Sequence, residues 1–452
     1  MQKRDRVFSC ILLALLLALF GIWAFTGAFT GLGLLVGALS CTLFALVLLR
    51  FVPAFTSLLF TDTAPLPDAA FGARTLRWEN RHPWLKITLF VLAFRILTYV
   101  VAYWMFTWLN GYTGGVWETL KTLWLRTDSP SYLGIAENWY VTEGDARFHL
   151  VFFPLYPMCI KAVWYAVGDY FASAMVVSNV FSVASAIACY ELTALELPFD
   201  EAKRSVRYML LLPAAFFLAA PMTESLFLFL SLMTLYFARR RRFLFACIFA
   251  ALAGLSRLPG ILLAVPVGLE MLFDLCERYR NGNAFKKKLF AYIGCMLILP
   301  LGFAAYLSIN AAVTGDAFRF MTYQKEHWDQ SMDYFFSASA YQAENILSAD
   351  ARMRWGLYVP NVAACLGALL LMLWGAKGMR PSYIAYFLVY FAITTGATWL
   401  LSAPRYLAVC YPLLLACTMR VREPQNDILL TALLVPLFVG YMTMYVIGYP
   451  VF

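Results

Sequence analysis

The sequence predicts an all-α protein that crosses a membrane many times. Of its 452 residues, 62% are hydrophobic and only 13% are charged, and the mean hydropathy is +0.71, which is well outside the range of soluble domains. Apolar segments of about 20 residues, the length that spans a bilayer, recur along the chain. Because the basic residues gather in short stretches between these segments, we attribute the net charge of +9 to membrane orientation and expect no binding to nucleic acid.

Placing every basic cluster in the cytosol gives about thirteen spans. The first follows Lys3, Arg4 and Arg6, and we expect it to remain as an anchor because no small-residue cleavage site is followed by a soluble domain. The run Arg239 to Arg242 then faces the cytosol. The expected spans lie at about 8–28, 32–51, 87–108, 171–195, 207–222, 224–238, 243–256, 258–275, 289–313, 355–375, 381–402, 405–420 and 427–448.

We expect these spans to form one integrated bundle. Residues 1–84 make an N-terminal hairpin with a cytosolic loop, residues 85–420 make the core, and residues 421–452 add a last helix. The core has two external segments, 109–170 and 314–354.

Two smaller features belong to this layout. The cytosolic loop carries Arg74, Arg77 and Arg81, in agreement with the inside bias of basic residues. Residues 154–168 begin with two prolines and are too short to span easily, so we expect an amphipathic helix along the outer surface.

The cysteines and histidines predict no disulfide framework and no metal site. Most of the ten cysteines fall inside apolar runs, where cysteine behaves as a small hydrophobic residue, and no CxxC spacing occurs. His149 and His327 have the chemistry of a base or a metal ligand, but the chain has only three histidines and no helical pair. The need for a divalent ion stays open.

The first sizeable polar stretch combines a carboxylate with a stiff aromatic segment. Asp128 stands two residues before Pro130, in a turn-forming context that leads into a helix-like run. It would suit an enzyme that takes its substrate from the lipid layer, or it would serve as an ordinary helix N-cap. The segment Phe153-Pro154-Leu155-Tyr156-Pro157, which its prolines stiffen, is either a wall beside Asp128 or part of an interfacial aromatic belt.

Three charged residues stand where a membrane protein rarely tolerates them. Glu224 lies near the outer boundary between two short apolar runs, so we expect it to have a partner or a ligand. Arg257 violates the inside bias and is either the partner of Glu224 or a ligand for an anion. Arg405 lies on the same side. Because a guanidinium fork recognises phosphate bidentately, both arginines are candidates for a phosphate site, with snorkelling to the interface as the competing explanation.

The stretch after Gly315 mixes aromatic and polar residues. Asp316, Gln324 and Trp328 belong to it. This composition is typical of a surface that faces carbohydrate, and equally of an amphipathic helix on a membrane.

Taken together, these segments resemble the phosphatidylinositol-glycan class V mannosyltransferase family, a branch of the GT-C glycosyltransferases that use polyprenyl-phosphate-linked sugars. The resemblance covers about residues 90–420. It rests on Asp128-x-x-x-Tyr132-x-x-Ile135-Ala136, Phe152-Phe153-Pro154-Leu155-Tyr156-Pro157, Thr223-Glu224-Ser225-Leu226-Phe227, Ser256-Arg257 with Gly260, Gly315-Asp316 with Gln324 and Trp328, and Arg405-Tyr406 with Tyr411-Pro412.

The resemblance implies a GT-C-type bundle with external juxtamembrane helices that transfers a hexose, mannose in the family. Asp128 would be the catalytic base, and Arg257 and Arg405 would bind the donor phosphate. The residues expected to contact substrate are Tyr132, Phe153, Tyr156, Glu224, Asp316, Gln324, Trp328 and Tyr406. The expected donor is a polyprenyl-phosphate sugar, and the expected acceptor is a glycolipid or cell-wall glycan. The protein would lie among the lipids of a bacterial plasma membrane, with its active site on the extracytoplasmic side.

The chain departs from the family pattern in two places. Two hydrophobic segments precede the expected first helix, and Asn138-Trp139 replaces a His-Gly type pair, which leaves the sugar and the acceptor open. Two other functions are alternatives to a glycosyltransferase of this family. A transporter or flippase of lipid-linked saccharides would carry charges at mid-span in paired helices, with an internal repeat. An O-antigen ligase or polymerase would carry its key residues in a large loop late in the chain.

Overall fold

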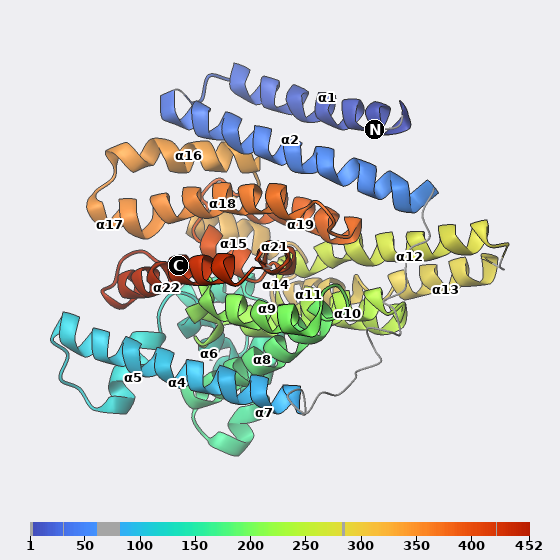
Figure 1. The fold of residues 1–452 in the computed structure, drawn as a ribbon. Coiled ribbons are helices and arrows are strands. Elements are labelled where there is room, and N and C mark those ends of the chain that lie inside the picture. Colours follow the sequence, from blue (N-terminus) through green and yellow to red (C-terminus); the bar gives the residue numbers. More distant parts are fainter. Residues whose placement is uncertain (1–2, 30, 61–81, 283–284, 422) are drawn as a thin grey trace.

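The computed structural model describes residues 3–29, 31–60, 82–282, 285–421 and 423–452, which fold into one helical bundle (Figure 1). Within these ranges, strand-like pairing is limited to one isolated antiparallel bridge between Met332 and Ala397. Eight helical segments of this part are long and apolar enough to cross a membrane, or up to nine if a bent pair counts as one span. The prediction of an all-α, multi-pass membrane protein is therefore confirmed.

The eight segments combine the longest helices of the chain. Three of them contain a break or a change of helix type. The segments are α1 (Lys3–Phe25), α2 (Gly31–Phe60), α4 (Pro83–Asn110), α8 (Tyr170–Thr193), η4 with α12 (Leu258–Leu263 and Ala264–Arg280), α13 with α14 (Lys286–Met296 and Leu301–Thr314), α17 through η5 to α18 (Ala351–Met353, Arg354–Tyr358 and Val359–Gly375), and α22 (Pro424–Val446). The bent pair is η2 (Asp145–Val151) with α7 (Leu155–Val167), at 109°.

The other described helices are shorter. They are α5 (Val116–Trp124), α6 (Ser129–Asn138), α9 (Phe199–Leu211), η3 (Ala215–Leu218), α10 (Glu224–Arg239), α11 (Phe243–Ser256), α15 (Arg319–Trp328), α16 (Phe335–Ser348), α19 (Pro381–Thr394), α20 (Ala403–Ala408) and α21 (Tyr411–Arg420). Five of the thirteen expected spans correspond to helices of this group, so a count of thirteen stays a prediction. The expected cytosolic loop with Arg74, Arg77 and Arg81 lies outside the described residues.

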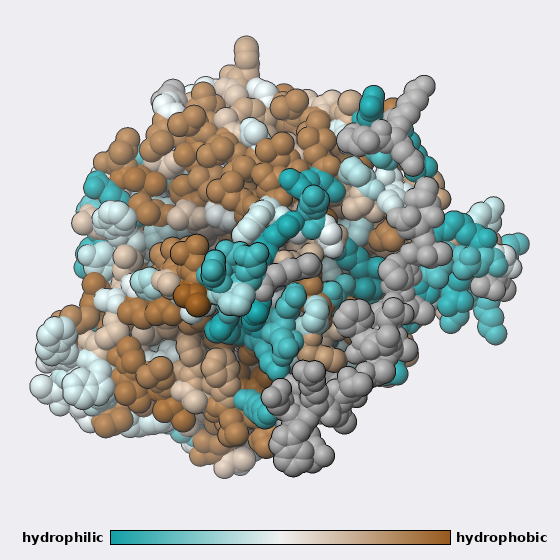
Figure 2. All heavy atoms as spheres, viewed as in Figure 1, coloured by the Kyte–Doolittle hydropathy of each residue, from teal (hydrophilic) through white to brown (hydrophobic). Residues whose placement is uncertain are grey.

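The long helices run in roughly the same direction and are stacked in layers (Figure 1). Helices α1 and α2 form one outer layer over α16 and α18, and α4 lies on the opposite side of the bundle. The start of α1 and the end of α12 lie at one end, and the connection between α4 and α5 lies at the other. Apolar residues cover the face over α1 and α2, whereas hydrophilic residues gather at the end where α12 ends (Figure 2).

Prolines explain why several expected spans are broken. Proline lacks a backbone N–H, and its ring clashes with the preceding helical turn. The helix expected over 207–222 ends at Leu211, next to Pro213, and an irregular tip continues to Thr223. The span expected over 405–420 is divided between α20 and α21, just before Pro412. Each break places non-helical backbone inside the bundle, where neighbouring side chains must satisfy it.

Helix α16 differs from the external loop expected at this position. Its N-terminal half is buried against α2 and α18. The ring of Phe335 lies 4.6 Å from that of Phe44, and the ring of Phe336 lies 5.2 Å from that of Trp23. Because the surrounding sequence is polar, its composition does not predict this short buried helix.

Ion pairs connect several helices near the run Arg239 to Arg242. Arg239 pairs with Glu196 at 2.5 Å, and Arg380 pairs with Glu270 at 2.5 Å. The first pair joins α10 to the segment after α8, the second joins α12 to the start of α19, and both are largely buried. Arg239 also lies 4.0 Å from Glu270, which connects the two pairs.

We expect the two ends of the bundle to face different compartments. In a cysteine-free background, a membrane-impermeant thiol reagent applied to intact cells should label Glu143→Cys and leave Arg240→Cys unlabelled until the cells are opened. Both residues are exposed, so accessibility is matched. Labelling of position 240 alone in intact cells would show that the protein has the opposite orientation and would exclude the proposed external site.

Candidate functional site

A strained backbone precedes the acid at the start of α6. Thr127 has φ +54°, a left-handed conformation that is costly for a β-branched residue and is often found at functional sites. Asp128 follows at the N-cap position, but its side chain accepts no capping hydrogen bond. The carboxylate therefore does not play the ordinary capping role that its sequence context allowed.

Instead, Asp128 joins a cluster of four charged residues that we call the charge cluster: Asp128, Glu224, Arg257 and Arg405. Arg405 donates from Nη1 to Oδ2 of Asp128 at 2.8 Å, and its Nε lies 3.4 Å from Oε1 of Glu224. Arg257 donates from Nη1 to the same Oε1 at 2.6 Å. The two acids and two arginines have a formal charge of zero, so each charge has a partner inside the protein.

The members of the charge cluster differ in their access to solvent. The side chain of Glu224 is 2% exposed and that of Arg405 is 5% exposed, whereas Arg257 retains 15% and Asp128 retains 28%. One oxygen of Glu224, Oε2, is buried without a hydrogen-bond partner in the described structure. A ligand would therefore meet Asp128 and Arg257 first, and Glu224 has one unused acceptor.

Breaks between helices position three of these four residues. Glu224 begins α10 directly after the irregular tip, Arg257 separates α11 from η4, and Arg405 belongs to the six-residue α20. Gly260 permits the turn at Arg257, since a Cβ there would lie 2.2 Å from the main-chain carbon of Ala253. The prolines and the glycine seen in the sequence thus create the ends from which the charges project.

Tyr406 connects the two arginines. Its ring centroid lies 5.5 Å from the guanidinium carbon of Arg257 and 5.4 Å from that of Arg405. Phe217 lies at 5.5 Å from the Arg405 guanidinium, and Phe227 at 5.8 Å from that of Arg257. These aromatic faces favour the cationic form of both side chains and restrict their motion.

The aromatic wall expected beside Asp128 is an extended set of ring contacts. Tyr132 lies 5.3 Å from Tyr156 and 5.2 Å from Phe152, measured between ring centroids. The ring of Trp328 also contacts Phe152, at 5.8 Å between centroids. Phe153 faces a different neighbour and stacks on Tyr306 at 4.0 Å. Tyr132, Tyr156 and Trp328 are thus linked through contacts, and Tyr132 is one helical turn from Asp128.

Two of the predicted substrate residues make their contacts elsewhere. Asp316 accepts a hydrogen bond from the backbone of Phe318 and pairs with Arg319 at 3.7 Å. Gln324 donates to Gln330, which in turn donates to the carbonyl of Trp399 at 2.6 Å. Their described contacts do not include the charge cluster.

Sequence reasoning did not single out Met222. Its sulfur lies 3.5 Å from Nη1 of Arg405 and 3.9 Å from Oγ1 of Thr127, so it connects the tip before α10 to the backbone beside Asp128. A buried methionine in an apolar run carries no signal of such a contact. The left-handed Thr127 was equally hidden, although the Thr-Asp-Ser-Pro sequence marks a turn.

The rings of His149 and His327 lie next to aromatic side chains. The ring of His327 stacks on Phe148 at 4.4 Å, and burial, followed by the nearby His327, lowers the pKa of His149. Among the described residues, no three His, Cys, Asp or Glu side chains gather in a metal-binding group.

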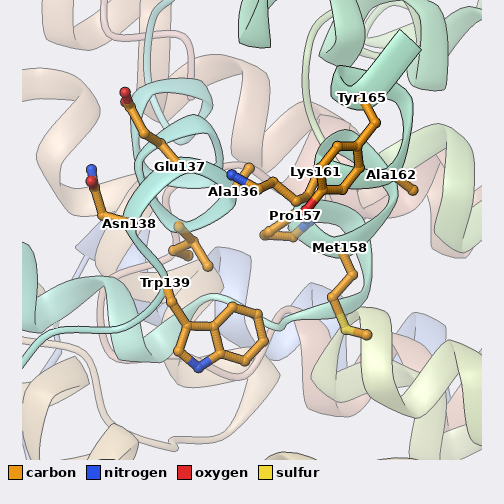
Figure 3. Close-up of a pocket in the computed structure, with 10 residues that line it drawn as sticks. Ala136, Glu137, Asn138, Trp139, Pro157, Met158, Lys161, Ala162 and Tyr165 are labelled. Atoms are coloured by element: carbon orange, nitrogen blue, oxygen red, sulfur yellow. The ribbon is translucent and has the colours of Figure 1, made fainter. Parts of the chain in front are cut away.

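A cavity of about 460 Å³ lies between α6 and α7 (Figure 3). Trp139 lines it from the end of α6, while Pro157, Met158 and Lys161 line it from α7. A second cavity of about 600 Å³ is bounded by residues 140–143 and Val313. Neither is lined by a member of the charge cluster.

Comparison of the chain with protein-family models, with curated proteins and with solved structures gave no match.

Proposed function

We propose that the protein is an integral membrane glycosyltransferase that transfers a hexose from a polyprenyl-phosphate donor to an extracytoplasmic glycolipid or envelope glycan. The observation that supports this best is the environment of Asp128. Arg405 holds one of its carboxylate oxygens at 2.8 Å, while the side chain keeps 28% of its surface open. A carboxylate that is both fixed and accessible supports a role as general base.

The proposed reaction is a single displacement with inversion. As the acceptor oxygen bonds to the anomeric carbon, its proton passes to Asp128. The bond from that carbon to the donor phosphate oxygen breaks, and its electron pair leaves with the lipid phosphate. The reaction consumes no other reactant, and the negative charge that develops on the leaving phosphate is the group that a cation stabilises.

Arg257 and Arg405 have distinct parts in this proposal. Arg257 is the more exposed of the two and its fork is suited to a phosphate. Arg405 is enclosed between Asp128 and Glu224 and chiefly orients the base. Tyr406, which borders both guanidinium groups, limits the space between them. Tyr132, Phe153, Tyr156, Asp316, Gln324 and Trp328 remain proposed substrate contacts.

A replacement of Arg257 tests the phosphate site. Arg257→Lys exchanges a planar fork for a point charge, so we expect the KM for the donor to rise about tenfold, equivalent to one lost charged hydrogen bond. The KM for the acceptor should change little. The assay is a donor titration with the purified protein in lipid nanodiscs, and Arg352→Lys, an exposed arginine, is the control. Unchanged donor kinetics would leave Arg257 only as the partner of Glu224.

One observation favours the transporter as the second candidate. The charge cluster lies at broken helices inside the bundle, and discontinuous helices also build the binding sites of secondary transporters. Proteoliposomes with a fluorescent undecaprenyl-phosphate hexose in both leaflets separate the two. Transfer to an external acceptor without movement of unreacted donor supports the enzyme, whereas movement without transfer supports the flippase.

A further inference from the structure

The tip between α9 and α10, residues 212–223, contains the short helix η3 and lies deep in the bundle. Side chains of α4 and α8 donate hydrogen bonds to its main-chain carbonyls. Arg95 donates from Nη1 to the carbonyl of Ala215 at 3.3 Å, and Tyr99 donates to that of Ala219 at 2.8 Å. Ser178 reaches the carbonyl of Met222 at 3.4 Å. Three donors thus hold the tip at regular intervals.

Arg95 is the unusual member of this set. It lies mid-way along the apolar helix α4 and is 1% exposed. Its other guanidinium contacts go to Oγ of Ser182, at 2.8 and 3.2 Å. In the described structure no acid pairs with it. A neutral side chain could donate to a carbonyl at a much lower desolvation cost, so satisfying the backbone does not explain the retained charge.

The residues of the tip explain why a charged side chain is found at position 95. Phe217 borders the Arg405 guanidinium, Met222 contacts both Arg405 and Thr127, and Glu224 follows immediately. A shift of the tip would therefore move the partners of Arg405 and, through Arg405, the carboxylate of Asp128. The guanidinium of Arg95 can anchor the tip rigidly because it forms charge-assisted hydrogen bonds to two elements at once.

We propose that Arg95 is a positioning residue that, together with Tyr99, fixes the tip and thereby the geometry of the charge cluster. Arg95 touches neither Asp128 nor any other member of the cluster in the described contacts, so it acts on the cluster indirectly, through the tip and α8. The expected effect on kcat rests on the proposed transferase function. The expected effect on the order of the tip does not.

The test compares Arg95→Met with the milder Tyr99→Phe. Because methionine fills similar space without a buried charge, we expect Arg95→Met to fold with a midpoint of thermal unfolding equal to or above that of the wild type. Hydrogen exchange of residues 212–225 should increase at least tenfold, while exchange in α12 and α13 stays unchanged. The kcat for transfer should fall at least tenfold with the donor KM within about twofold, since geometry is lost and binding is kept.

Tyr99→Phe removes only the bond to Ala219 and the contact with Asn179, and should show the same pattern at smaller size. The control is Arg204→Met. Arg204 lies toward the start of α9, away from the tip, and donates to the carbonyl of Val421. Its loss should leave exchange of the tip and kcat unchanged.

The outcomes separate this inference from the proposed function. Faster exchange of the tip with unchanged kcat, or unchanged exchange in both variants, overturns the positioning role. A lower unfolding midpoint for Arg95→Met with full kcat below that midpoint shows a purely structural residue and also overturns it. If the wild type transfers no sugar, the proposed function fails, and the exchange measurement still decides whether Arg95 fixes the tip.

Discussion

Asp128→Asn should lower the rate of sugar transfer by at least about 100-fold, because a positioned general base typically contributes about 10²–10⁴-fold. Asparagine keeps the size of the side chain and an oxygen that can accept the hydrogen bond from Arg405, but it cannot take up the proton of the acceptor. The measurement is single-turnover transfer by the purified variant in nanodiscs. Donor binding and thermal unfolding should stay close to those of the wild type.

The structure makes this prediction sharper than a sequence motif alone allows. If Asp128 merely capped α6, its replacement would affect stability and leave the rate unchanged. The side chain forms no cap and instead bonds to Arg405, 277 residues away. Glu143→Gln, which neutralises an exposed acid of the same segment, 109–170, is the matched control and should retain full activity. Near wild-type transfer by Asp128→Asn would exclude Asp128 as the base and point to Glu224 or Asp316.

The fold class and the candidate residues could be predicted because both depend on local composition. Apolar segments of spanning length and the placement of Lys and Arg need no knowledge of contacts. Glu224, Arg257 and Arg405 were recognisable because charges are rare near the boundaries of apolar runs. The structure then brings all three to Asp128.

The remaining details depend on packing between distant segments. No local pattern states that Arg405 pairs with Asp128, or that Arg257 shares Glu224 with it. Helix α16 was missed because its buried face, starting at Phe335, is embedded in a polar stretch. The lengths of the spans were overestimated where prolines such as Pro213 turn a continuous apolar run into two helices and a tip.

Glu224→Ala should cause the largest loss of stability among single replacements in the charge cluster. Removing one partner of a buried ion pair leaves an uncompensated charge and typically costs about 3–5 kcal/mol. Here the carboxylate, which is 2% exposed, serves two arginines, at 2.6 Å from Arg257 and 3.4 Å from Arg405. The variant leaves Arg257 without its acid partner and Arg405 with Asp128 alone. The measurement is the free energy of unfolding from reversible denaturant titration in mixed micelles.

A matched surface replacement gives the scale for this effect. Asp200 pairs with Lys203 at 3.1 Å, but its side chain is 86% exposed, and an exposed pair contributes about 0–1 kcal/mol at most. Asp200→Ala should therefore be nearly neutral under the same conditions. A loss for Glu224→Ala no larger than that for Asp200→Ala would show that water reaches the charge cluster and that its burial does not set its energetics.

The double variant Glu224→Ala with Arg257→Met completes the argument. If the cost of Glu224→Ala arises from the stranded cation, removal of that cation should restore a large part of the lost stability, because an apolar pair often replaces a buried ion pair without penalty. Transfer activity should not return, since the proposed phosphate ligand is gone. Restored stability without activity would mean that the charge cluster is retained for its chemistry, whereas additive losses would mean that Glu224 and Arg257 stabilise the bundle independently.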